Sequence, residues 1–327
     1  MISIRYAMGV LLGTVMSCNV LAQGAPDVWP SRQISLVVTV APGTVADLVG
    51  RTIAPKLAER LKQPVVVENK VGASGVIGAD AVAKSAPNGY TLMLMVNSLT
   101  MVPSLYKNIP YDTLGDFAPI SRVATSGYSF VVNLSAMPVK DLNEFIALVK
   151  ANPGKYSYSS PGKGTAHHLA MELIKQNVGL DLLHVPHKDM GSALGSVLGA
   201  HVPMMFAPTA SVLPQAKAGS LRILAVTGSK RSPIAPNVPT YSELGYKFLE
   251  DVDGYWGVMA PAKTSPAIIT RLNRELLGIM ALQDVKEKLA TQDVTAVSST
   301  PEELGAQMKA DVQRWAKLIS DAKITTD

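Results

Sequence analysis

The amino-acid sequence predicts an α/β protein built of two domains. The chain has 327 residues, of which 47% are hydrophobic and 17% are charged. This is a globular composition with ample apolar material for a core, and the length is that of about two domains. Short apolar runs alternate with segments of helical periodicity along most of the chain. Such alternation indicates βα units and a mostly parallel sheet.

The first 22 residues have the pattern of a secretory signal peptide. Arg5 supplies a positive charge before the apolar run 7–16, and Val20-Leu-Ala22 places small or apolar residues before a cleavage point at Gln23. The apolar run is too short to span a membrane as a helix. The alternative, a buried N-terminal helix, does not explain the charge asymmetry. We therefore expect an exported mature chain that begins at Gln23.

Cys18 is the only cysteine, and it lies inside this segment. Cleavage after Ala22 would leave no disulfide, no thiol nucleophile and no thiolate metal ligand. Residues Val15-Met-Ser-Cys18 loosely resemble a lipoprotein cleavage box. A lipid anchor at Cys18 is the less favoured alternative, because Met16 is unusual in such a box and the downstream cleavage site is good.

Charge and composition argue against a nucleic-acid-binding protein. The formal net charge is +5, which falls to +4 when residues 1–22 and their single Arg5 are removed. Lysines and arginines are scattered among acids without a long basic run, and aromatic residues make up only 6% of the chain. The mild positive charge weakly favours acidic small molecules as ligands.

The first βα unit contains the most informative loop of the chain. An apolar run, Leu36–Val40, predicts a buried strand, and the breaker Ala41-Pro-Gly43 precedes a helix whose apolar positions are Val49, Ile53, Leu57 and Leu61. Pro55 should kink or restart that helix. Unpaired amides at a helix N-terminus can bind a carboxylate or phosphate. The alternative is an ordinary βα turn.

Further strands and helices follow in order along the chain. Apolar runs predict strands at 65–68, 92–96, 130–132 and 223–226, and a helix opens at Gly72 and continues through Val82. Asp141 is a good N-cap for the next amphipathic segment. Ser265-Pro266 has the pattern of an N-cap followed by the first helical residue. Thr300-Pro-Glu-Glu303 predicts a capping box before a C-terminal helix.

A second domain inserted into the first explains this order of elements. Residues 125–228 carry their own series of strands and helices, and the C-terminal helices then need the first domain as a partner. We expect one lobe from residues 23–124 and 229–327 and another from 125–228, with crossings near 124–128 and 225–229. A cleft between two lobes is where small ligands bind.

Two glycine-rich loops resemble nucleotide-binding motifs without matching them. Gly72, Gly75 and Gly78 are spaced G-x-x-G-x-x-G, and no acid ends the following strand, so close helix–strand packing explains them better than a dinucleotide. Residues 160–165 resemble a phosphate loop, but a Walker motif requires a glycine at position 157 and a serine or threonine directly after Lys163, where Gly164 stands. What remains is a glycine-rich loop before a helix near Thr165, a second candidate anion site.

The histidines do not form a convincing metal site. All five lie between positions 167 and 201, but His167 and His168 point to different faces of a helix, and no third ligand joins His168 and Glu172. We predict no metal and no cofactor. One or two histidines are expected to face the cleft as hydrogen-bond donors. No nucleophile elbow is present, and Asp47 is better explained as a structural acid than as a general base.

Ordered sequence blocks across nearly the whole mature chain resemble one protein family. The blocks are Ala41-Pro-Gly43 with Asp47, residues 63–69, 72–83, 86–90, 103–106, 110–112 and 116–119, Gly164-Thr165 with His168, His184-Val-Pro186, and residues 221–227, 230–233 and 238–240. Together they resemble the Bug-type periplasmic solute-binding receptors of tripartite tricarboxylate transporters.

This resemblance implies the fold, the location and the function. It implies a two-lobed type II periplasmic binding protein fold that closes by a hinge around a ligand in the cleft. The implied function is to capture a small carboxylate (a di- or tricarboxylate, a hydroxy acid or an aromatic carboxylate) in the periplasm and deliver it to membrane permease components. We expect a monomer, no catalytic residue and no nucleic-acid partner.

The resemblance also implies which residues bind the ligand. They lie in the first loop, after the strand that ends at Val96, and in the second glycine-rich loop, namely Pro42, Gly43, Thr44, Val45, Ala46, Asp47, Asn97, Ser98, Ser160, Gly164, Thr165 and His168. Three further positions complete the predicted site. They are Tyr128, a candidate for stacking on an aromatic ring or for packing at the hinge, and His187 and Ala207.

The chain departs from the family pattern at three places. Thr44 stands where a second glycine is common, His187 replaces a usual tyrosine, and Ala207-Pro208 replaces a usual Asp-Asn pair. The last change removes an acceptor for an ammonium group, so we expect a ligand without an amine. Two alternatives share these features, an exported enzyme that uses Asp47 or His168 as acid–base and a ligand receptor for a sensor kinase.

Overall fold

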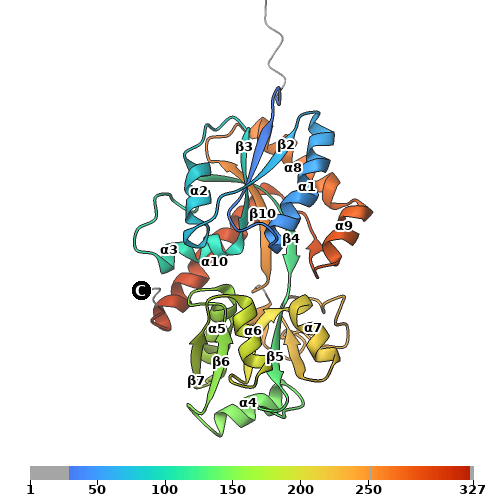
Figure 1. Ribbon diagram of the computed structural model, residues 1–327. Helices are drawn as coiled ribbons and strands as arrows, with labels where there is room; N and C mark the ends of the chain where they lie inside the picture. Colours follow the sequence, from blue (N-terminus) through green and yellow to red (C-terminus); the bar gives the residue numbers. More distant parts are fainter. Residues whose placement is uncertain (1–28, 251, 325–327) are drawn as a thin grey trace, which may run out of the picture.

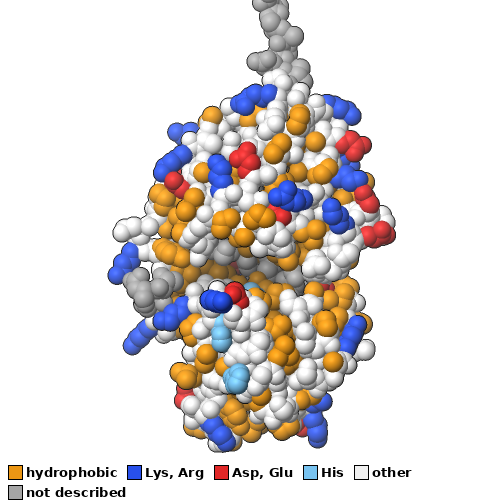
Figure 2. All heavy atoms as spheres, viewed as in Figure 1, with side chains coloured by type: hydrophobic (Ala, Val, Ile, Leu, Met, Phe, Trp, Pro, Cys, Tyr) orange, Lys and Arg blue, Asp and Glu red, His pale blue; other side chains and the backbone are white. Residues whose placement is uncertain are grey.

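Two helix-covered β-sheets form two lobes, one beside the other along the molecule (Figure 1). The structure is a computed structural model that describes residues 29–250 and 252–324. A hollow separates the lobes on the face shown in Figure 2. The predicted two-lobed α/β fold is confirmed. The predicted signal peptide and Cys18 lie outside the described residues.

The first lobe is built on a mixed sheet with the strand order β11-β4-β10-β3-β1-β2. Its strands are β1 (Ile34–Val38), β2 (Val65–Asn69), β3 (Thr91–Val96), β4 (Phe117–Ser126), β10 (Gly254–Pro261) and β11 (Thr295–Ala296). β1 pairs parallel with β2 and β3, whereas β10 pairs antiparallel with β3 and β4. The sheet is therefore not mostly parallel as predicted, because β10 returns from the second lobe against the direction of β3.

Helices cover both faces of this sheet. One face carries α1 (Val45–Leu61), α8 (Pro266–Met280) and α9 (Gln283–Ala290), and the other carries α2 (Val76–Ala83) and α10 (Pro301–Asp321). Alternate residues of β3 enter the two cores, Leu92 and Leu94 on one side and Met93 on the other. Short helical turns η1 (Ala73–Gly75), η2 (Asn97–Thr100) and α3 (Val102–Leu105) lie toward the second lobe.

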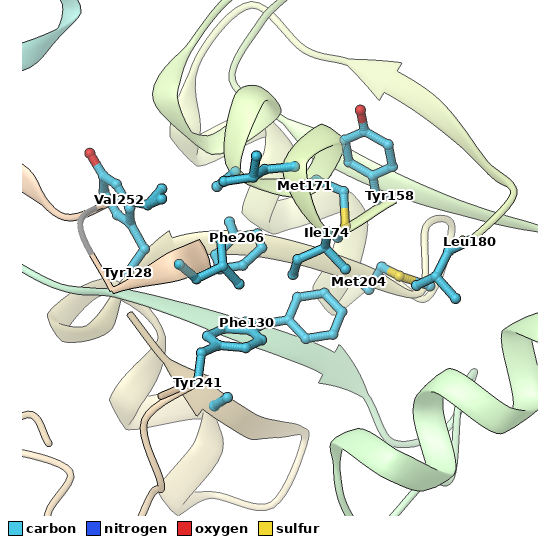
Figure 3. Close-up of a cluster of buried hydrophobic side chains, with 14 of the residues drawn as sticks. Tyr128, Phe130, Tyr158, Met171, Ile174, Leu180, Met204, Phe206, Tyr241 and Val252 are labelled. Carbon is cyan, nitrogen blue, oxygen red and sulfur yellow. The ribbon is translucent and has the colours of Figure 1, made fainter. Parts of the chain in front are cut away.

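The second lobe contains a five-stranded sheet with the order β7-β6-β8-β5-β9. Its strands are β5 (Tyr128–Asn133), β6 (Tyr156–Ser160), β7 (Leu182–Pro186), β8 (Met204–Pro208) and β9 (Leu221–Val226). Helices α4 (Leu142–Lys150) and α5 (Ala166–Val178) cover one face, and α6 (Met190–Leu198) and α7 (Thr209–Lys217) cover the other. Phe130 and Phe206 lie at the centre of the larger core (Figure 3).

The chain passes from the first lobe to the second between β4 and β5 and returns to the first lobe before β10, not directly after β9 as predicted. Residues 229–252 were expected in the first lobe, yet Tyr241, Leu249 and Val252 pack in the second core, beside the short η3 turn (Lys247–Leu249) (Figure 3). Helix α10 also contacts both lobes, because Leu304 belongs to the first-lobe core and Trp315 to the second-lobe core.

Most local predictions hold within a residue or two. The β1 strand begins two residues earlier than predicted and ends at Val38, which leaves Thr39 and Val40 in the loop. Asp141, Ser265 and Thr300 cap their helices as predicted, and Thr300 forms the capping box with Glu303. Helix α1 does not restart at Pro55 but runs continuously through it.

The glycine-rich segment 72–78 packs closely on the first loop, as expected of a packing motif. A Cβ atom at Gly78 would lie 2.7 Å from the Lys70 carbonyl oxygen and 3.0 Å from the Thr39 methyl group. No side chain fits in that space without a shift of the backbone. Gly78 thus brings α2 against the end of β1, where the loop to α1 begins.

Candidate functional site

A cavity of 580 Å³ lies between the two lobes. Such a volume is typical of small-molecule sites. The first lobe contributes residues 39–41, 71–75, 96–98, 102, 105 and 106, and the second lobe contributes residues 128, 161 and 163–167. The cavity therefore lies between the start of α5 and the turns that follow β1, β2 and β3.

The cavity brings together five of the residues predicted for the site. They are Asn97, Ser98, Tyr128, Gly164 and Thr165. The loop Pro42–Asp47 does not line it, although the preceding residues Val40 and Ala41 do. Ser160, His168, His187 and Ala207 also lie outside the lining. Contacts from these residues to a ligand stay predictions.

Asp47 organises the first loop from behind. Its carboxylate accepts hydrogen bonds from the Gly43 N–H at 3.0 Å, from Arg51 Nε at 2.9 Å and from Asn69 Nδ2 at 3.0 Å. The hydrogen bond from Arg51, together with those from Gly43 and Asn69, lowers the pKa of Asp47 to about 2. A carboxylate with such a pKa is a poor general base at neutral pH. Asp47 is thus a structural acid that holds the loop.

The start of α1 offers free amides beside the cavity. Thr44 caps the helix, since its hydroxyl donates to the Ala41 carbonyl at 2.8 Å and accepts from the Asp47 N–H at 3.4 Å. The N–H groups of Val45 and Ala46 have no hydrogen-bond partner in the described part of the chain. The Thr44 hydroxyl is already engaged, so the amides are the groups that α1 offers an anion.

His168 organises the second loop in the same way. It is 4% exposed, and its Nδ1 accepts a hydrogen bond from the Gly164 N–H at 3.0 Å. Nδ1 is therefore unprotonated, and burial, with Lys175 and Lys163 nearby, lowers the pKa of His168 to about 4. The ring stacks on His184 with 3.8 Å between ring centroids. Predicted as a ligand contact, His168 instead lies behind the loop and shapes it.

The other predicted site residues of the second lobe are bonded or packed within the lobe itself. Ser160 is fully buried and its hydroxyl lies 2.7 Å from His184 Nε2. The His187 N–H donates to the Ser160 carbonyl at 2.9 Å. Ala207 is fully buried in the core beneath α6 and α7. The Ala207 side chain faces away from the cavity because alternate residues of a strand point to opposite faces.

Thr227 joins the two segments, near Tyr128 and near Asp253, where the chain crosses between the lobes. Its hydroxyl accepts from the Tyr128 N–H at 2.8 Å and donates to the Asp253 carboxylate, and its own N–H donates to the Tyr128 carbonyl at 2.9 Å. Asn97 of the first lobe donates to the Asp253 carbonyl at 3.3 Å. A Cβ atom at Gly254 would lie 2.8 Å from the Tyr128 hydroxyl. Tyr128 is thus a hinge residue that also lines the cavity.

Several lining residues were not predicted from the sequence. Lys163 is exposed at the cavity and forms no ion pair within the part of the chain that the structure describes. His167, rather than its neighbour His168, lines the cavity. The turn 71–75 was interpreted only as a packing motif. A signal for Lys163 existed, because it is the one cation in the predicted second loop.

The charges of the lining favour an anion. Among the residues that the structure describes, Lys163 is the only charged side chain of the lining, since burial lowers the pKa of His167 to about 4 and leaves it neutral, and none of these lining residues is an aspartate or glutamate. A second cavity of 490 Å³ beside the hinge is lined by acids and bases together, among them Arg122, Lys230, Asp253 and Asp293. That mixture gives no comparable preference for one charge.

Residues 29–250 and 252–324 contain neither a metal-binding cluster nor a membrane-spanning helix. No group of three or more His, Cys, Asp or Glu side chains there could hold a metal ion. None of the helices in those ranges is long and apolar enough to cross a membrane.

Comparison with known proteins identifies similar chains. The family model described as "Tripartite tricarboxylate transporter family receptor" matches residues 49–324. Protein BugT of Bordetella pertussis is 37% identical over 317 residues, which are 96% of this chain and 95% of BugT.

Solved structures agree with this result. The periplasmic binding protein BugD is 33% identical, with a TM-score of 0.72 over 90% of this chain and 99% of BugD. A protein of R. palustris solved with adipate is 29% identical, with a TM-score of 0.76 over 90% of this chain and 99% of that one.

Proposed function

Because this chain belongs to the tripartite tricarboxylate transporter receptor family, we propose that it captures a small carboxylate outside the cytoplasm and delivers it to membrane permease components. The protein acts as a periplasmic monomer that binds its ligand without converting it. Its ligand is a carboxylate that carries no ammonium group.

The charge of the interlobe cavity is the observation that carries this proposal. Within residues 29–250 and 252–324, Lys163 is the only charged side chain of the lining, and no lining residue is acidic. An anion entering the cavity gains a cationic partner, whereas an ammonium group finds no acidic side chain. The buried Ala207 of β8 likewise offers no acceptor for an amine.

The helix starts on either side of the cleft supply further donors. The free amides of Val45 and Ala46 belong to the first lobe, and those of Ala166 and His167, also without partners in the described chain, belong to the second. Both loops are held by an internal acceptor, Asp47 in one and His168 in the other. We expect closure of the hinge to bring both sets of amides to the ligand.

The relatives support the same ligand class. The R. palustris protein was solved with adipate, a dicarboxylate without an amine. Asp47 is held as a low-pKa carboxylate, and His168 is a buried neutral imidazole outside the cavity, so neither residue is suited to acid–base catalysis on a ligand there. Both candidate residues of the enzyme alternative thus have structural tasks.

The test is a calorimetric titration of the mature protein with adipate, malate, citrate, benzoate, glutamate and aspartate. We expect at least one of the simple carboxylates to bind and the two amino acids to bind at least about tenfold more weakly, because no acid of the lining offsets desolvation of an ammonium group. NMR of each ligand should show no turnover. Preferred binding of glutamate or aspartate, or conversion of any ligand, would contradict the proposal.

Transport itself is tested in proteoliposomes that contain the cognate permease. Uptake of the ligand should depend on added binding protein. The Thr44→Gly variant serves as a control in these measurements, since the Thr44 hydroxyl is already bonded to Ala41. It should keep the ligand preference and lose only a few tenths of a kcal/mol of helix-cap stability.

A further inference from the structure

We propose that the ligand of this cavity is an aromatic monocarboxylate, whose ring lies against Tyr128 and His167 while its carboxylate lies toward Lys163. This inference rests on the proposed function and narrows its ligand class. It follows from the apolar walls of the cavity, its aromatic floor and its single cation.

The aromatic floor consists of Tyr128 and His167. Their ring centroids lie 4.6 Å apart at an interplanar angle of 56°. Tyr128 lies at the edge of the second-lobe core with its hydroxyl directed away from that core (Figure 3), and Gly254 leaves the hydroxyl its space. A tilted pair of fixed rings presents edges and faces to a third ring, the arrangement that aromatic groups prefer.

His167 contributes its ring rather than its nitrogens. Both nitrogens are buried and have no hydrogen-bond partner among the described residues. Burial lowers the pKa of His167 to about 4, so the ring is neutral at physiological pH. A neutral imidazole whose two nitrogens are buried presents mainly a flat, weakly polar ring to a ligand.

The side walls are apolar on the first-lobe side. Val71 is 53% exposed there, and Val40, Val96 and Leu105 are partly exposed. Covering these side chains with an apolar ligand body removes their surface from water, which favours binding. A ligand that is polar over its whole surface would not gain this contribution.

The polar side chains of the cavity are largely occupied. The hydroxyls of Ser74 and Tyr106 bond each other at 2.8 Å, and the Thr165 hydroxyl donates to the Gly162 carbonyl at 2.8 Å. Asn97 donates to the Asp253 carbonyl. The hydroxyl groups of a hydroxy acid would therefore compete with existing bonds rather than find free partners.

The number of cations in the described lining favours a ligand with one carboxylate over a ligand with several. Lys163 is the single cation among the described lining residues, so a second or third carboxylate of a larger anion would lose water without gaining a second cationic side chain. A monocarboxylate matches the cavity with one charge at Lys163 and an apolar body elsewhere.

The test compares four probes by isothermal titration calorimetry: benzoate, cyclohexanecarboxylate, adipate and citrate. Benzoate should bind at least about tenfold more tightly than adipate and citrate, and more tightly than cyclohexanecarboxylate. Tighter binding of adipate, citrate or cyclohexanecarboxylate than of benzoate would overturn the inference. Adipate or citrate as the best ligand would leave the proposed function standing, whereas binding of no carboxylate would refute both.

Variants locate the ring contact. His167→Ala should weaken benzoate about tenfold, and the conservative His167→Phe should rescue that loss, because a flat ring is restored. Loss of benzoate binding in His167→Phe equal to that in His167→Ala would show that a nitrogen is required and would overturn the aromatic-floor argument. The exposed His201, outside the cavity, provides the matched control His201→Ala.

The charge contact has its own pair of variants. Lys163→Met should weaken benzoate about tenfold or more, whereas Lys150→Met on the exposed end of α4 should not change binding. Circular dichroism of each variant checks that it is folded. Unchanged benzoate affinity in folded Lys163→Met would contradict the proposed orientation of the carboxylate.

Discussion

At the scale of single residues, the chemistry near the cleft divides into side chains that shape loops and side chains that face the cavity. Asp47 and His168 are the most conspicuous polar residues of the two loops, yet each is buried, and its side chain accepts a hydrogen bond from a backbone amide of its own loop. Lys163 and His167, their less conspicuous neighbours, line the cavity. The family pattern thus identified the loops beside the cavity, but not which side chains of those loops line it.

Replacing Asp47 by Asn tests its structural task. The change removes the charge that pairs with Arg51 at 2.9 Å, and since the Arg51 side chain is 52% exposed we expect a modest loss of about 1–2 kcal/mol in the free energy of unfolding. Urea unfolding at neutral pH measures it. The exposed Asp181→Asn is the matched control.

The contribution of Asp47 to the stability of the fold should decrease as the pH falls. The pKa of Asp47 is lowered from 3.8 to about 2 in the folded state, so its stabilisation is complete above pH 3.8 and is lost as the pH falls through about 2. The difference in Tm between wild type and Asp47→Asn should shrink over that window. A difference that grows on acidification would contradict this account.

At the scale of elements, hydrogen bonds at the hinge hold together segments that are distant in sequence. The two crossings between the lobes, near Tyr128 and near Asp253, are joined by the hydroxyl of Thr227, which is 2% exposed. Helix caps, in contrast, depend on neighbours in the sequence, and Asp141, Ser265 and Thr300 were predicted from it. The late position of the return crossing, before β10, was missed, because no local pattern marks the packing of Tyr241 and Val252 in the second core.

Thr227→Val should weaken the hinge. It leaves the Tyr128 N–H buried without its side-chain acceptor and removes a donor from Asp253, at a cost of about 1–3 kcal/mol in the free energy of unfolding. Thr227→Ser keeps the hydroxyl and should recover most of this loss. Urea unfolding compares the two variants with wild type, and equal stability of Thr227→Val and Thr227→Ser would show that the hydroxyl contributes nothing.

At the scale of the whole molecule, three neutral histidines make the stability depend on pH between about 6.5 and 4. Burial is the main cause that lowers the pKa of His167 and His168 to about 4 and that of His184 to about 3, and the charges of Lys175 and Lys163 also lower the pKa of the latter two. The nearby Glu172 raises the pKa of His184 only in part. The folded chain therefore binds fewer protons than the unfolded chain in this range.

The stability of the protein should fall as the pH drops from 6.5 toward 4. With the folded pKa values depressed, the stabilisation is complete above pH 6.5 and is lost on acidification toward the folded pKa. Calorimetric Tm values measured from pH 7 to 4.5 test this, and His168→Asn, whose oxygen can still accept from Gly164, should reduce the slope. A Tm that stays constant over this range would refute the neutral assignment of these histidines.

The sequence by itself determined the two-lobed α/β class, most helix caps and the position of the two glycine-rich loops. These features follow from apolar periodicity and from capping patterns, which act over a few residues. Only the tertiary structure decided that the chain returns to the first lobe just before β10, that β10 is antiparallel, and that His167 lies at the cavity with His168 behind it. The physical reason is that burial and hydrogen-bond partners across the hinge come from segments far apart in sequence, such as Tyr128, Thr227 and Asp253.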